Sequence, residues 1–174
     1  MTLDVTTLRL QPFGREHLDA FAATLADPEV QRFTRLPAAP ASGFAAAWLA
    51  RYEDGRRDGT CAAFAIVDGE GGFLGAALAP AIDAEARTVE LGYLVVPAAR
   101  GRGVATAALS LLTDWAFAEL GALRIELLIS VENDASKRVA ERCGYRREGV
   151  LRSTYVKEGV RDDTEIWSRL PTDL

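Results

Sequence analysis

A glycine-rich stretch between an apolar strand and a long helix is the feature that most constrains this 174-residue chain. The stretch reads Arg100, Gly101, Arg102, Gly103, Val104 and Ala105. Two glycines allow the backbone to turn its N–H groups toward an anion. The helix that follows adds unpaired N–H groups and the positive end of its dipole. Because the two arginines also carry forked donors, the stretch predicts a pyrophosphate-binding loop.

Two other kinds of phosphate loop lack residues that they require. A P-loop needs Gly-Lys-Ser/Thr at the start of the helix, where this chain has Gly103-Val104-Ala105. A dinucleotide-binding fingerprint needs a third glycine, and that position is Thr106. These differences argue against a nucleotide-binding domain. A plain glycine-rich turn with solvated arginines remains open at this point.

The order of the predicted elements indicates an α/β (α+β) fold with a mixed sheet. Three successive strands in the middle of the chain imply hairpins. The strand–helix–strand unit from Thr88 to Val131 predicts a right-handed crossover between parallel strands. Strands are predicted over residues 7–12, 61–67, 73–78, 88–96, 124–131, 150–156 and 164–167, and helices over 17–25, 44–55, 104–120 and 135–142, with a short helical restart at Asp27-Pro28.

Composition and charge exclude several classes of function. The net charge of −5 argues against a nucleic-acid partner, because neutralising phosphates needs a basic surface. One histidine and two distant cysteines, Cys61 and Cys143, predict no metal site. The chain has neither a signal-peptide pattern nor an apolar run of the ~20 residues that a membrane span needs. We therefore expect a cytoplasmic protein with no membrane partner.

The glycine-rich stretch resembles the pyrophosphate motif of the GNAT superfamily of N-acetyltransferases. Arg100-x-x-Gly103-x-Ala105 is similar to the family pattern Gln/Arg-x-x-Gly-x-Gly/Ala. Three further segments resemble the family in order and spacing, namely residues 89–93, 133–136 and 142–145. The two ends of the chain, residues 7–10 and 165–170, are similar to the RimJ/RimL branch, which acetylates ribosomal-protein N-termini.

The resemblance implies a single N-acetyltransferase domain over residues 1–174. The family fold has a mixed, mostly antiparallel sheet of six to seven strands, with a splayed parallel pair and about four flanking helices. It also implies acetyl-CoA as the cofactor, with coenzyme A as the product. The cofactor-binding residues expected on this basis are Leu94, Val95, Val96, Arg100, Gly101, Arg102, Gly103, Val104, Ala105, Thr106, Asn133 and Ser136.

Glu90 is the predicted general base for the acceptor amine. A carboxylate in an apolar strand should be partly buried and have a raised pKa, and many family members place a catalytic glutamate there. The alternative is a carboxylate that is simply paired with an arginine. For the developing oxyanion, the resemblance implies a backbone N–H near Val95 or Val96.

The general acid is not identified by the sequence. Many relatives carry a tyrosine after the asparagine segment, and the matching positions here are Val139 and Ala140. Ser136, Cys143 and water remain as possibilities, and Ser136 is taken as the second catalytic candidate. Asn133 has a competing structural role, because asparagine is a favourable N-cap for the helix that follows.

The expected acceptor is a primary amine, either a small molecule or a protein N-terminus. Phe33, Arg35 and Tyr155 are the predicted substrate-binding residues. A non-catalytic acyl-CoA-binding module is the alternative function, because no acid is identified. The sequence leaves open the acceptor, the use of acyl groups other than acetyl, and whether the chain forms a homodimer.

Overall fold

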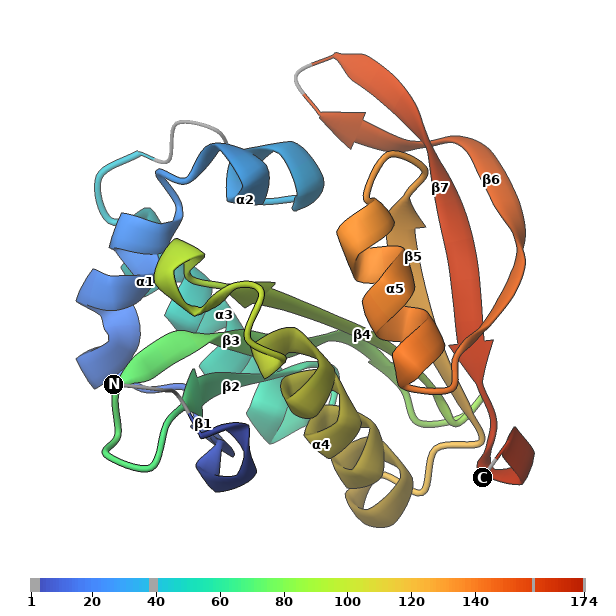
Figure 1. The fold of residues 1–174 in the computed structure, drawn as a ribbon, viewed down its shortest axis with the longest axis horizontal. Coiled ribbons are helices and arrows are strands. Elements are labelled where there is room, and N and C mark those ends of the chain that lie inside the picture. Colours follow the sequence, from blue (N-terminus) through green and yellow to red (C-terminus); the bar gives the residue numbers. More distant parts are fainter. Residues whose placement is uncertain (1–3, 38–40, 158, 174) are drawn as a thin grey trace.

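The computed structural model describes residues 4–37, 41–157 and 159–173, which form a seven-stranded sheet between helices (Figure 1). The strand order is β1-β2-β3-β4-β5-β7-β6. Every neighbouring pair is antiparallel except β4 and β5. The strands are β1 (Arg9–Pro12), β2 (Ala62–Val67), β3 (Phe73–Asp83), β4 (Thr88–Val95), β5 (Arg124–Ser130), β6 (Arg146–Lys157) and β7 (Val160–Arg169). This confirms the predicted mixed sheet with one parallel pair.

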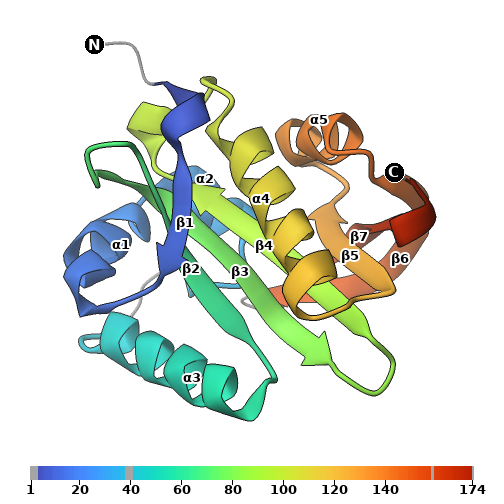
Figure 2. The same ribbon diagram turned by 90° about the horizontal axis from the view of Figure 1, so that it is seen from below.

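Helices cover both faces of the sheet (Figure 2). α4 and α5 lie on one face, and α1 and α3 lie on the other. The helices are α1 (Leu18–Thr24), α2 (Pro28–Phe33), α3 (Phe44–Asp58), α4 (Val104–Glu119) and α5 (Asp134–Arg142). The short α2 is a separate helix, so the described residues contain one more α-helix than the four expected from the resemblance.

The core is divided by the sheet into two apolar clusters. On the α4 side, Leu109 and Leu112 pack on Val89 and Ile125. On the α1 and α3 side, Phe21 packs with Trp48, Leu49 and Tyr52 in a second cluster. Strand β2 is buried along nearly its whole length, because both of its faces are covered by helices. Its sequence is accordingly an unbroken apolar run rather than an alternating one.

Several predicted boundaries differ from the structure. Strand β3 continues to Asp83 instead of ending at Leu78. α3 continues through Gly55 to Asp58 and ends at Gly59, which has a left-handed φ of 72°. Gly55 lies inside the helix, and its lack of a side chain makes room for Cys61. A Cβ built at Gly55 would be 2.1 Å from the Cys61 Sγ. The last two strands are also longer than predicted, because most of the β6 side chains are exposed and leave no apolar pattern to read.

Candidate functional site

A cavity of about 930 Å³ lies where the parallel strands β4 and β5 separate. Their pairing stops at Leu91 and Leu127, although β4 continues to Val95 and β5 to Ser130. Figure 1 shows the two strands diverging toward this end of the sheet. The cavity is lined by the unpaired ends of both strands, together with residues of α2, α3, α4 and α5. The splay expected from the resemblance is therefore present, and it opens the sheet at the site.

The glycine-rich loop lies at one end of this cavity. Gly101 and Gly103 have φ values of 70° and 82°, in the left-handed region that side chains disfavour. A Cβ at Gly101 would meet nothing within 4 Å, so the requirement for glycine comes from the backbone conformation. Gly103 is the N-cap of α4, and its carbonyl accepts the first helical hydrogen bond, from Ala107.

The first N–H groups of α4 are the ones that an anion would bind. Val104, Ala105 and Thr106 precede the first helical hydrogen bond and line the cavity. They lie at the positive end of a 16-residue helix, which favours an anion. Arg138 and Arg142 line the cavity from α5 and add positive charge. The exposed Arg102 does not line the cavity.

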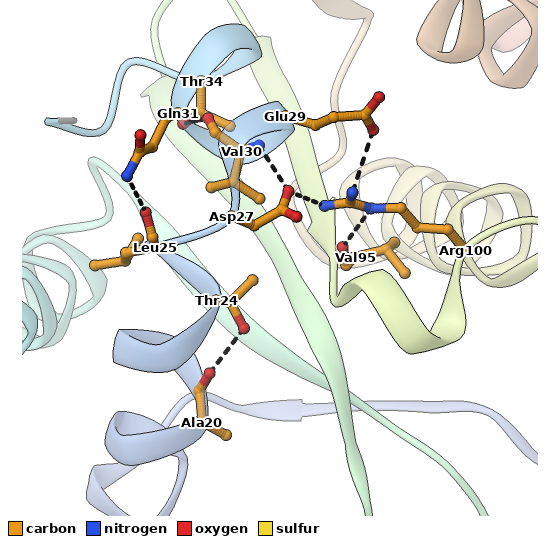
Figure 3. A network of polar contacts seen from close by, with 10 residues as sticks. All are labelled: Ala20, Thr24, Leu25, Asp27, Glu29, Val30, Gln31, Thr34, Val95 and Arg100. Carbon is orange, nitrogen blue, oxygen red and sulfur yellow. Dashed lines mark hydrogen bonds and ion pairs between the residues drawn. The ribbon is translucent and has the colours of Figure 1, made fainter.

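Arg100 lines the cavity and also makes several polar contacts within the protein. Its guanidinium donates to the carboxylates of Asp27, at 2.5 Å, and Glu29, at 3.2 Å (Figure 3). Its Nε donates to the Val95 carbonyl at 3.1 Å. Asp27 also caps α2 by accepting from the Val30 N–H at 3.0 Å, and the Arg100 hydrogen bond lowers its pKa. Arg100 thus joins the loop to α2 and to the end of β4.

The end of β4 distinguishes the two expected oxyanion donors. The Val96 N–H donates to the Leu74 carbonyl at 2.9 Å, so it is already used. Val95 is paired with Gly75 in the antiparallel register. Hydrogen bonding alternates along such a ladder, so the Val95 N–H points away from β3 and toward the gap beside β5. Val95 lines the cavity and Val96 does not.

Glu90 lies on the α3 face of β4 and lines the cavity. Its side chain is 22% exposed, and its Oε1 accepts from the Arg35 guanidinium at 3.3 Å. Burial raises the pKa of Glu90, the charge of Arg35 opposes that shift, and Glu126 reinforces it. The ion pair with arginine is therefore present, and the general-base role stays a prediction. Glu90 retains the raised pKa that suits a general base.

Tyr93 is a site residue to which the sequence assigned no role. It lies on the opposite face of β4 from Glu90, because the positions differ by an odd number along a strand. Its hydroxyl is buried, and among the described residues it has no partner in hydrogen-bonding geometry. The pKa of Tyr93 is raised to about 12, because the effect of burial outweighs the opposing effect of the Ser136 side chain. Tyr93 and Ser136 both line the cavity, so its lining includes two hydroxyl-bearing side chains.

Asn133 has the structural role that competed with cofactor contact. Its Oδ1 accepts from the Ser136 N–H at 3.0 Å and caps α5. Both residues also line the cavity, so capping leaves cofactor contact possible. Leu94 lines the cavity as well, although its side chain belongs to the core cluster on the α1 and α3 side.

Two of the three predicted substrate-binding residues, Phe33 and Arg35, line the cavity. Tyr155 does not line it, but its hydroxyl donates to the Thr34 carbonyl at 2.5 Å and so holds the end of α2. Trp48 lines the cavity while packing in the core.

No group of three His, Cys, Asp or Glu residues in the described part of the chain could hold a metal ion. Within the same residues, no helix is long and apolar enough to cross a membrane. The cavity is thus lined by the N–H groups that begin α4 at one end, which suit an anion, and by the Glu90 carboxylate with its raised pKa at the other.

Comparison with known sequences identifies a family and several relatives. The acetyltransferase (GNAT) domain matches residues 7–146. The chain is similar to the probable N-acetyltransferase YjcK of Bacillus subtilis (strain 168), at 36% identity over 87 residues, which are 50% of this chain and 48% of that protein. The chain spans about half the length of three curated relatives that it matches, YjcK among them.

Solved structures with the same fold cover nearly the whole chain. RimJ of Mycobacterium smegmatis, in complex with CoA-disulfide, is similar with a TM-score of 0.90 and 23% identity, over 99% of this chain and 86% of that one. The spermidine N-acetyltransferase of Vibrio cholerae, in complex with CoA and spermine, is similar with a TM-score of 0.85 and 20% identity, over 97% and 98%. These likenesses show the same fold, and the domain match over residues 7–146 shows that the chain belongs to the GNAT acetyltransferase family.

Proposed function

We propose that this chain is an acetyl-CoA-dependent N-acetyltransferase that acts on a primary amine. The observation that carries the proposal is the cavity between β4 and β5. It joins the free N–H groups of the Gly103–Thr106 turn to the partly buried carboxylate of Glu90. An anion site and a general base at the two ends of one cavity fit a phosphorylated acyl donor that meets an amine.

The residues around the loop fit coenzyme A. The pyrophosphate would lie against the N–H groups of Val104 and Ala105, with Arg138 and Arg142 adding charge. The splayed strands leave room for an extended arm to run between β4 and β5. Acetyl-CoA, when bound, supplies an activated acetyl thioester. The structural relatives RimJ and the spermidine acetyltransferase are complexes with coenzyme A species, which supports this choice.

The amine would attack the acetyl group directly, with both substrates bound. Glu90 takes the proton that the amine loses, directly or through water. The Val95 N–H donates to the acetyl oxygen as negative charge builds there. The leaving sulfur takes a proton, for which the Ser136 hydroxyl, beside Tyr93, is the proposed source. Holding both substrates in one cavity contributes much of the acceleration by proximity.

A second candidate is a non-catalytic module that binds acyl-CoA. It rests on the positions Val139 and Ala140, where many relatives have the tyrosine that serves as acid. The Tyr93 and Ser136 hydroxyls weaken this alternative, since they place two donors in the cavity. A thiol with an ordinary pKa near ~8.5 is also a tolerable leaving group without an acid.

Two measurements test the proposal. Acetyl-CoA should raise the melting temperature, because a ligand of the native state stabilises it, whereas NADH and ATP should not. Release of free thiol from acetyl-CoA, measured over a panel of amines and N-terminal peptides, should then depend on the acceptor. A thermal shift without acceptor-dependent thiol release would favour the binding module, and the absence of any shift would contradict both functions.

A further inference from the structure

The charges at the acceptor end of the cavity are unbalanced. We define this end as the part on the α3 face, lined by Phe33, Arg35, Trp48, Arg51, Tyr52 and Glu90. It holds two guanidiniums and one carboxylate. The segment from Leu36 to Ala50, which precedes Arg51, contains no ionisable side chain that could correct this.

Arg35 and Glu90 are already a pair. Their separation of 3.3 Å leaves the Arg35 guanidinium, which is 56% exposed, with donors that Glu90 does not use. Lys157 reaches the same region from the β6–β7 hairpin, where its Nζ donates to the Thr34 carbonyl at 3.1 Å. Arg35, which lines the cavity, is the residue that brings positive charge to this end from the α2 side.

Arg51 is the second cation at this end of the cavity. No carboxylate of residues 4–37, 41–157 or 159–173 lies within ion-pair distance of its guanidinium, which sits over the Tyr52 ring at 5.3 Å. The pKa of Tyr52 is raised to about 12, chiefly by burial. Arg51 opposes this shift and Glu90 reinforces it, so both charges act on the same hydroxyl. Arg51, Tyr52 and Glu90 thus surround one part of the cavity.

We propose that the acceptor is an amine that also carries an anionic group, in the first place a carboxylate. This inference rests on the proposed acetyltransferase function. The anionic group binds Arg51 and the free donors of Arg35, while the amine faces Glu90. Arginine suits this role because its planar fork matches a carboxylate with two parallel hydrogen bonds. Free amino acids and peptides with an acidic residue near the N-terminus share this chemistry.

A neighbouring hollow lined by carboxylates would instead favour an acceptor that carries a second cation. It has a volume of about 440 Å³, adjoins the acceptor end at Arg51, and is lined by Asp54, Asp58 and Asp83. Two of these carboxylates are engaged, Asp54 with Arg57 and Asp83 with the Ala86 N–H. A long diamine could place its far cation there, but it would have to pass the Arg51 guanidinium, which repels it.

Three acceptors of equal length separate these preferences. They are 4-aminobutanoate, butylamine and 1,4-diaminobutane, with kcat/KM measured by thiol release at low ionic strength. We expect the carboxylate to raise kcat/KM about tenfold over butylamine, which corresponds to about 1.4 kcal/mol. The preference should shrink with added salt, because these guanidiniums are partly exposed. The peptides Ser-Glu, Ser-Gln and Ser-Lys, with a free N-terminus and an amidated C-terminus, are compared with free amino acids. This comparison tells whether an acidic side chain or an α-carboxylate is the preferred anionic group.

Arg51→Gln should bring the carboxylate preference close to one, and Arg51→Lys should retain part of it. Arg57→Gln is the matched control, since it removes an exposed arginine of the same helix that points to Asp54. Melting curves check that each variant is folded. Equal rates for the three acceptors, a preference for the diamine, or a carboxylate preference that survives Arg51→Gln would overturn the inference. Absence of acetylation of every amine would instead overturn the proposed function itself.

Discussion

Replacing Asp27 by asparagine tests whether Arg100 holds the site together. Asparagine keeps an oxygen that can cap α2, but it removes the charge that faces Arg100. The two side chains are 14% and 31% exposed, so the pair lies between the buried and surface cases. A hydrogen bond to a charged group contributes about 1.5–3 kcal/mol and an exposed ion pair about 0–1 kcal/mol. We therefore expect Asp27→Asn to cost about 1–2 kcal/mol.

Two further variants divide this cost into its parts. Asp27→Ala also removes the cap, so it should cost about 1 kcal/mol more than Asp27→Asn. Glu29→Gln is the control for charge alone: Glu29 is 68% exposed and 3.2 Å from Arg100, so its loss should cost less than about 0.5 kcal/mol. The free energy of unfolding is measured by urea titration, with m-values compared to check that the unfolding transition is unchanged.

The pH dependence gives an independent check. The pKa of Asp27 is lowered in the folded state, chiefly by Arg100. Its stabilising contribution is therefore present above the unfolded pKa and is lost as the pH falls through the folded pKa. Asp27→Asn should remove this part of the acid destabilisation, so the difference from wild type should narrow below about pH 4. The reasoning is refuted if Asp27→Asn is as stable as wild type at pH 7, or if it is as unstable as Asp27→Ala.

Three other substitutions test the remaining parts of the site and fold. Glu90→Gln should lower kcat/KM by about 10²–10⁴-fold, the usual contribution of a general base, and an unchanged rate would remove Glu90 from the proposed mechanism. Arg35→Ala removes the charge that lowers the pKa of Glu90, so the acid limb of the kcat/KM profile should move to higher pH, and a move to lower pH would contradict the assignment. Gly103→Ala should cost about 1–3 kcal/mol at a φ of 82° and reduce the thermal shift produced by acetyl-CoA, with Ser110→Ala in α4 as the control.

The elements with strong local signals were predicted well from the sequence. The strand, glycine loop and helix around residues 88–120 follow from an apolar run, a proline and two glycines whose conformational freedom is a local property. The β6–β7 hairpin was predicted too short, because β6 is an exposed edge strand that has little apolar periodicity. The helix end at Gly55 was wrong, because a contact with Cys61 explains that glycine better than a helix terminus does.

The sequence by itself determined which atoms at the loop can bind an anion, since the N–H groups at the start of α4 belong to consecutive residues whose geometry is local. Only the tertiary structure decided what the side chains do. Arg100 contacts Asp27 across 73 positions of the chain, so its guanidinium joins the loop to α2. The approach of Tyr93 to Ser136 likewise depends on the separation of β4 and β5, and the pairing of Arg35 with Glu90 depends on how α2 packs against β4. Such pairings depend on distances between segments that no spacing along the sequence encodes.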